Sequence, residues 1–72
     1  MFYTVLEVQV LTSGVKSCAP FVFDDYNAAL AKFFTICVAA STSEIPYHAA
    51  FVLQDTGNIV KAEIFDRRIV EA

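Results

Sequence analysis

Several residue types that mark whole classes of protein are scarce in this chain of 72 residues. It has two glycines, two prolines, two cysteines, one histidine and no tryptophan. With only Gly14 and Gly57, each in a separate turn, there is no glycine-rich phosphate loop, and the cysteines and the histidine lack the spacing of a metal site. We therefore expect no metal and no cofactor. With no internal repeat or linker either, residues 1–72 are expected to form one domain.

Basic residues are also few. Five Lys and Arg residues stand against eight Asp and Glu residues, which gives a formal net charge of -3. An acidic chain repels phosphate backbones, so nucleic acid is not expected as a ligand. The only adjacent basic pair is Arg67-Arg68, and such a pair is usually a solvated surface feature.

A long hydrophobic run is missing. The longest apolar stretch, from Ala28 to Ala40, contains Lys32 and falls short of the about 20 residues that a transmembrane helix needs. The start of the chain has no basic segment, and Glu7 interrupts its apolar stretch, so a signal peptide is not expected. These features favour a cytoplasmic protein in which Cys18 and Cys37 stay reduced.

Apolar residues, by contrast, are abundant. The composition is 57% hydrophobic and 14% aromatic. A chain of this size buries only about 60–65% of the surface that it exposes when unfolded. This is more apolar material than one small domain easily hides, so the composition predicts a homo-oligomer, a dimer or larger.

Alternating apolar residues and turn signals predict four strands and one helix. Gly14 and Gly57 mark tight turns, Asp24 or Asp25 begins the helix as a cap, and Pro46 stops anything that follows it. The predicted order is β-β-α-β-β, a two-layer α+β domain with an antiparallel four-stranded sheet and one helix on one face. The predicted bounds are Phe2–Leu11, Val15–Phe23, a helix from Asp25 to Ala40 or Ser41, Tyr47–Gln54, and Ile59–Asp66, after which the tail from Arg67 to Ala72 either extends the last strand or frays.

The faces of the first strand differ in polarity. One face is predicted to be core, while the other contains Glu7 and Gln9, which need solvent or partners. Pro20 lacks a backbone donor and places the second strand at an edge of the sheet. The predicted core face consists of Phe2, Thr4, Leu6, Val8 and Val10.

Two apolar stripes run along the predicted helix. The first should pack on the sheet and contains Tyr26, Leu30, Phe33, Cys37 and Ala40. The second lies about 100° away and has no partner within the chain. Wrapping by the sheet needs more strands than 72 residues supply, and membrane binding needs a basic face that is missing. We therefore expect a second copy to meet the second stripe, with the interface at Ala31, Phe34, Thr35 and Val38.

Candidates for chemistry are few, and none forms a catalytic set. His48 beside Tyr47 could serve as a general base or bind a ligand, or could simply face solvent. Cys37 on a helix interior is expected to be core, and Asp24-Asp25 is better explained as a helix cap. We therefore expect no catalytic residues.

Three segments have a recognisable overall pattern: Phe2 to Gln9, Asp25 to Phe34, and Tyr47 to Leu53 followed by Asp55 to Asn58. In this pattern the chain resembles small phage and prophage proteins of gut Firmicutes. Phe34 departs from it, because a polar aromatic residue is expected there. The resemblance implies a phage origin and expression inside the host cell, and it carries no site residues.

Three functions remain open at this stage, of which an enzyme is the least favoured because a catalytic set is missing. The first is a non-enzymatic homo-oligomer that docks on a phage or host protein through apolar surface, in the cytoplasm or on the virion. The second is an oligomer that binds or sequesters a small molecule such as a nucleotide signal, because arginines recognise phosphate. Its site would gather Tyr3, Tyr47, His48, Arg67 and Arg68 at a subunit junction.

Overall fold

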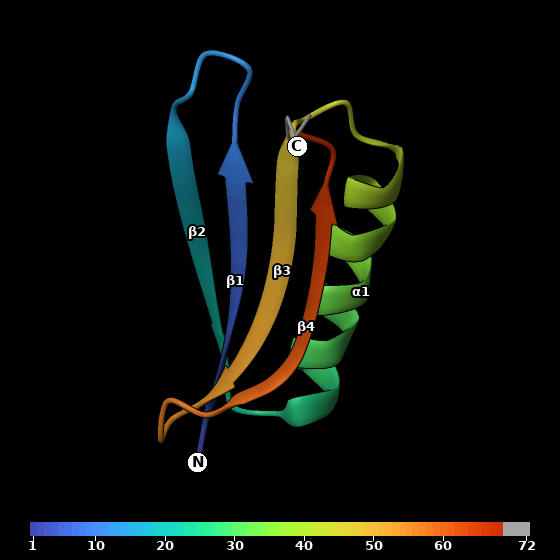
Figure 1. The fold of residues 1–72 in the computed structure, drawn as a ribbon. Helices are drawn as coiled ribbons and strands as arrows, with labels where there is room; N and C mark the ends of the chain where they lie inside the picture. Colours follow the sequence, from blue (N-terminus) through green and yellow to red (C-terminus); the bar gives the residue numbers. More distant parts are fainter. Residues whose placement is uncertain (69–72) are drawn as a thin grey trace.

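The structure, a computed structural model, describes residues 1–68 (Figure 1). Its elements confirm the predicted order and, within two residues at each end, the predicted bounds. The part of the predicted tail that follows Arg68 lies outside the described residues, while Arg67 and Arg68 do not extend the last strand. The elements are β1 (Tyr3–Val10), β2 (Lys16–Phe23), α1 (Tyr26–Thr42), β3 (Tyr47–Gln54) and β4 (Ile59–Asp66).

The four strands form one antiparallel sheet in the order β2-β1-β3-β4. Because β1 is antiparallel to both of its neighbours, β2 and β3 run in the same direction on either side of it. The connection between them is α1, which crosses over β1 and contacts all four strands. A crossover of this kind keeps the helix on a single face of the sheet, so the two-layer α+β fold is confirmed.

Local chemistry fixes the ends of these elements. Asp25 caps the helix, because its Oδ2 accepts a hydrogen bond of 3.2 Å from the backbone N–H of Ala28. Gly14 and Gly57 adopt φ angles of 88° and 92°, which glycine takes without a steric penalty. Pro20 lies on β2, an edge strand as predicted, where a missing backbone donor costs little.

The core lies between the sheet and α1, but on the face of β1 that was not predicted. Val5 of β1 and Val52 of β3 are fully buried and pack with Phe33 of the helix. Since side chains alternate along a strand, Glu7 and Gln9 share the face of Val5 and lie on the helix side. The predicted core face is therefore wrong: Thr4, Leu6, Val8 and Val10 lie on the opposite side of the sheet, and Phe2 is exposed before β1 begins.

The helix is also rotated relative to its predicted orientation. Its buried positions are Ala29, Phe33, Ile36 and Ala40, whereas Tyr26, Leu30 and Cys37 of the predicted stripe are only half-buried at its flank. Two of the four buried residues are alanines, which lets the helix approach the small Ala50 on β3.

Candidate functional site

The sheet face turned away from α1, here called the open face, is apolar and uncovered within residues 1–68 (Figure 1). Strand pairing arranges its sixteen side chains in four rows, with one residue from each strand in each row. All but Thr4, Lys16 and Asp66 are apolar. Taken in the order β2, β1, β3, β4, the rows are Val22, Thr4, Leu53, Ile59; Pro20, Leu6, Phe51, Ala62; Cys18, Val8, Ala49, Ile64; and Lys16, Val10, Tyr47, Asp66.

Large side chains on the open face remain in contact with solvent. Val22 is 64% exposed and Ile64 is 50% exposed, both on edge strands. Contiguous exposed apolar surface of this kind is rare on monomers and marks interaction sites. Sequence reasoning missed this site because it treated the apolar face of β1 as the core.

A second apolar surface runs along α1 and is here called the outer stripe: Ala31, Phe34, Thr35 and Val38. All four residues are exposed, Phe34 by 51% and Val38 by 69%. At about 100° per residue, the outer stripe lies opposite the buried side of the helix. The Thr35 hydroxyl donates a 2.9 Å hydrogen bond to the carbonyl of Ala31, so its polar group is satisfied within the helix. The stripe was predicted as a subunit contact, and the chain itself leaves it uncovered.

The five predicted ligand-binding residues are not gathered within one chain. Tyr3 lies against Tyr26, with ring centroids 5.1 Å apart, at the end of the sheet where it pairs with Gln54. Tyr47 pairs with Val10, seven residues further along β1, which at about 3.3 Å per residue is about 23 Å away. His48 and Tyr47 are neighbours in sequence, yet they point to opposite faces of the sheet.

The two arginines also separate across the sheet. Arg67 lies on the helix side, where its guanidinium donates to the carbonyls of Ala40 and Ile45. These contacts place a cation at the negative end of α1. Arg68 lies on the other side, 4.7 Å from the centre of the Tyr47 ring. Both guanidinium groups are therefore engaged within the chain.

Arg68 also forms an ion pair with Asp66 at the edge of the open face. Its Nε and Nη2 donate to the two carboxylate oxygens at 2.9 Å each. These bonds, together with one from the backbone N–H of Arg68, lower the pKa of Asp66 to about 2. The same pairing raises the pKa of Arg68. Asp66 therefore keeps its negative charge at any pH above that value.

His48 is buried, so the interpretation of it as a solvent-facing strand residue is wrong. It is 3% exposed, and its Nε2 lies 2.7 Å from Oε2 of Glu7 on the neighbouring strand β1. Gln9 donates to the same carboxylate at 3.4 Å. The pair explains how Glu7 is accommodated under the helix.

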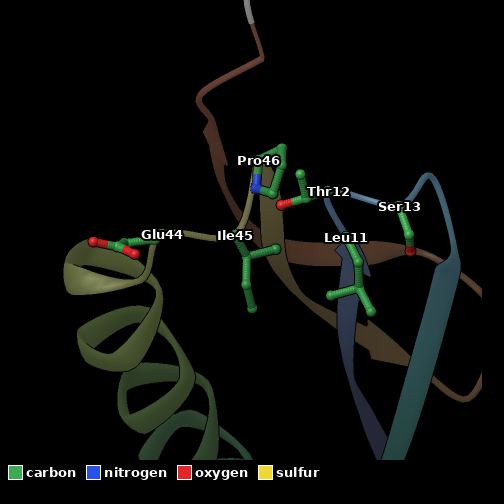
Figure 2. A pocket seen from close by; sticks show the side chains of 6 residues that line it. All are labelled: Leu11, Thr12, Ser13, Glu44, Ile45 and Pro46. Carbon is green, nitrogen blue, oxygen red and sulfur yellow. The ribbon is translucent and has the colours of Figure 1, made fainter.

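A hollow of about 420 Å³ lies at the end of the molecule where α1 terminates. Figure 2 shows it between the β1–β2 turn and the α1–β3 connection, with Leu11 and Ile45 pointing inward and Glu44 pointing away from them. Its lining is loop residues, and none of the predicted ligand residues is among them. The lining consists of Leu11, Thr12, Ser13, Glu44, Ile45 and Pro46.

Both cysteines are free thiols. Cys18 is exposed on the open face of β2, while Cys37 is half-buried on α1. Burial is the main cause that raises the pKa of the Cys37 thiol, and the charge of Glu63 adds to it. Among residues 1–68, no three His, Cys, Asp or Glu side chains come together as potential metal ligands. The single helix of the described chain is not long and apolar enough to cross a membrane.

Comparison of the chain with family models, with curated proteins and with solved structures found no match in any of the three. The uncovered apolar surfaces are therefore the features from which a function can be argued.

Proposed function

We propose that the chain is a small, non-enzymatic interaction protein that acts as a homo-oligomer and docks on another protein through apolar surface. One observation carries the proposal: a single helix covers one face of the sheet, and the other face is apolar and open. Because every copy of the chain exposes this surface, a second copy can bury it, and two-fold dimers are the commonest such assembly.

The outer stripe supports the docking part of the proposal. Its members occupy positions i, i+3, i+4 and i+7 of α1, the spacing with which a helix inserts into an apolar groove of another protein. None of the four residues is charged, and the Thr35 hydroxyl is bonded to its own helix. The partner that fits this stripe is a protein with an uncharged groove.

The resemblance to small phage and prophage proteins supports a phage or host protein as that partner. The same resemblance favours the cytoplasm of the host cell, with association with the virion as the alternative. The small-molecule alternative receives no comparable support, because Arg67 and Arg68 are engaged on opposite sides of the sheet.

The solution mass of the purified protein tests the homo-oligomer. Light scattering at micromolar concentration should give at least twice the 8.0 kDa mass of the chain. A mass of 8.0 kDa that persists as the concentration is raised would contradict the proposal.

Docking through the outer stripe can be tested by crosslinking in cells. A photo-crosslinking side chain in place of Val38 should give one discrete adduct with a second protein. The matched control carries Phe34→Asp in addition, which places a charge on the stripe and should remove the adduct. An adduct that is missing, or one that Phe34→Asp leaves unchanged, would contradict docking through this stripe.

A further inference from the structure

The charges of the open face lie at one end of it. Lys16 on β2 and Asp66 on β4 are the outer residues of one row, with Val10 and Tyr47 between them. We propose that the open face binds a second copy of the chain, sheet against sheet, about a two-fold axis parallel to the strands. The inference rests on the homo-oligomer of the proposed function and assigns its interface and its symmetry.

The placement of charge selects this axis. A two-fold axis parallel to the strands brings β2 of one copy over β4 of the other and keeps each row in place. Lys16 then faces the ion pair of Asp66 and Arg68 of the partner subunit, so charged groups meet charged groups, and by symmetry the same contact forms twice. An axis perpendicular to the strands would instead reverse the order of the rows and set Lys16 over Val22 of the partner subunit, where a charge meets an apolar side chain at a cost.

The same arrangement matches apolar side chains along the centre of the interface. β1 lies over β3 of the second copy, so Leu6 meets Phe51 of the partner subunit, whereas Ala49 is fully buried within its own chain and offers no contact surface. Face-to-face sheets of this kind pack about 10 Å apart with their strands within about 30° of each other. Both helices then lie on the outside, which leaves the two outer stripes free for another protein.

The area of the open face is that of a small contact that forms and dissociates with protein concentration. Four strands spaced about 4.8 Å apart and eight residues of about 3.3 Å each span roughly 19 by 26 Å, or about 500 Å² per copy. Two copies together bury about 1,000 Å² of projected area, which reaches the lower limit for a specific interface. The outer stripe, with only four side chains, presents less surface than the sixteen-residue open face.

Two variants separate this interface from one on the helix. Leu6→Glu places a charge at the centre of the open face and should reduce the mass to that of one chain, whereas Phe34→Asp on the outer stripe should leave the oligomer intact. The opposite result, in which Phe34→Asp dissociates the oligomer and Leu6→Glu does not, would overturn the inference but keep the homo-oligomer. A wild-type chain that is monomeric would overturn both.

Charge reversal tests the orientation of the two-fold axis. It changes only exposed side chains, so it still tests the proposed interface if the Leu6→Glu variant does not fold. In an Arg68→Gln background, which leaves the Asp66 carboxylate without its cation, Lys16→Asp replaces two attractions with two repulsions and should raise the dissociation constant about tenfold. Adding Asp66→Lys in the same background should restore it to within about threefold of the Arg68→Gln chain, because opposite charges face each other again. A double variant that dissociates as readily as Lys16→Asp alone would overturn the proposed axis.

Discussion

Replacing Phe33 or its neighbour Phe34 with alanine tests the orientation of α1 against the sheet. Phe33 is 4% exposed and packs in the core, whereas Phe34 is 51% exposed on the outer stripe. Truncation of a buried Phe costs about 3–5 kcal/mol. A chain of this length has a total stability of about 4–11 kcal/mol, so Phe33→Ala should remove a large part of it. Phe34→Ala loses mainly the edge contact between the two rings, whose centroids are 5.4 Å apart, worth about 0.5–1.5 kcal/mol.

Urea unfolding followed by circular dichroism at one fixed protein concentration measures the difference. With a slope of about 1 kcal/mol per molar urea, Phe33→Ala should lower the midpoint by about 3 M or more, and Phe34→Ala by about 1 M. If Phe33→Ala is unfolded without urea, Ile36→Val provides a milder probe of the same buried side and should cost about 0.5–1.5 kcal/mol. Equal losses from Phe33→Ala and Phe34→Ala would refute the assigned orientation.

Three further predictions concern single side chains. Arg67→Gln should lower the free energy of unfolding by about 1 kcal/mol, because the charged donor to the end of α1 is lost. Arg68→Gln is the matched control. An equal loss of unfolding free energy in both variants would contradict the separate roles of the two arginines. Asp66 should titrate near pH 2 in carbon-detected NMR, and in Arg68→Gln its pKa should rise toward the ordinary value of 3.8. Because the pKa of Asp66 is lowered in the folded state, the stability that this group contributes is present above pH 3.8. That stability is lost as the pH falls through about 2. At neutral pH in dilute protein, Cys37 should react with iodoacetamide more slowly than Cys18, because burial raises its pKa; equal rates would show that burial does not protect it.

The sequence predicted the elements well because their signals are local. Gly14, Gly57, Pro46 and the Asp25 cap each act within a few residues, and all of them lie at the element boundaries in the structure. Pro20 likewise placed β2 correctly at an edge. Alternation then divided β1 and β3 into two faces, and this division is confirmed, whereas a register shift in β4 pairs Ile59 instead of Val60 with Leu53.

Which face the helix covers was not predictable from alternation. Glu7 and Gln9 made one face of β1 look solvent-exposed, yet that face lies under α1. The reason is the bond between Glu7 and His48, which are 41 residues apart in the chain and become neighbours only through the β1–β3 pairing. A polar contact that forms between distant segments in this way cannot be recognised from one strand alone.

The candidate site was predicted in part. The outer stripe was found from the sequence, because it depends only on helical spacing. The open face was missed, because its exposure follows from the choice of the face that α1 covers. The proposed ligand cluster assumed that neighbours such as Arg67 and Arg68 act together, whereas the structure directs their side chains to opposite sides of the sheet.

The rate at which the Cys18 thiol is chemically labelled tests the proposed interface most directly. This thiol is exposed on the open face of a single chain, and the second copy would place Ile64 of the partner subunit over it. In a Cys37→Ala background, the rate of Cys18 labelling should rise about tenfold as the protein is diluted from well above to well below its dissociation constant. A rate that stays constant while light scattering shows the oligomer dissociating would contradict a second copy on this face.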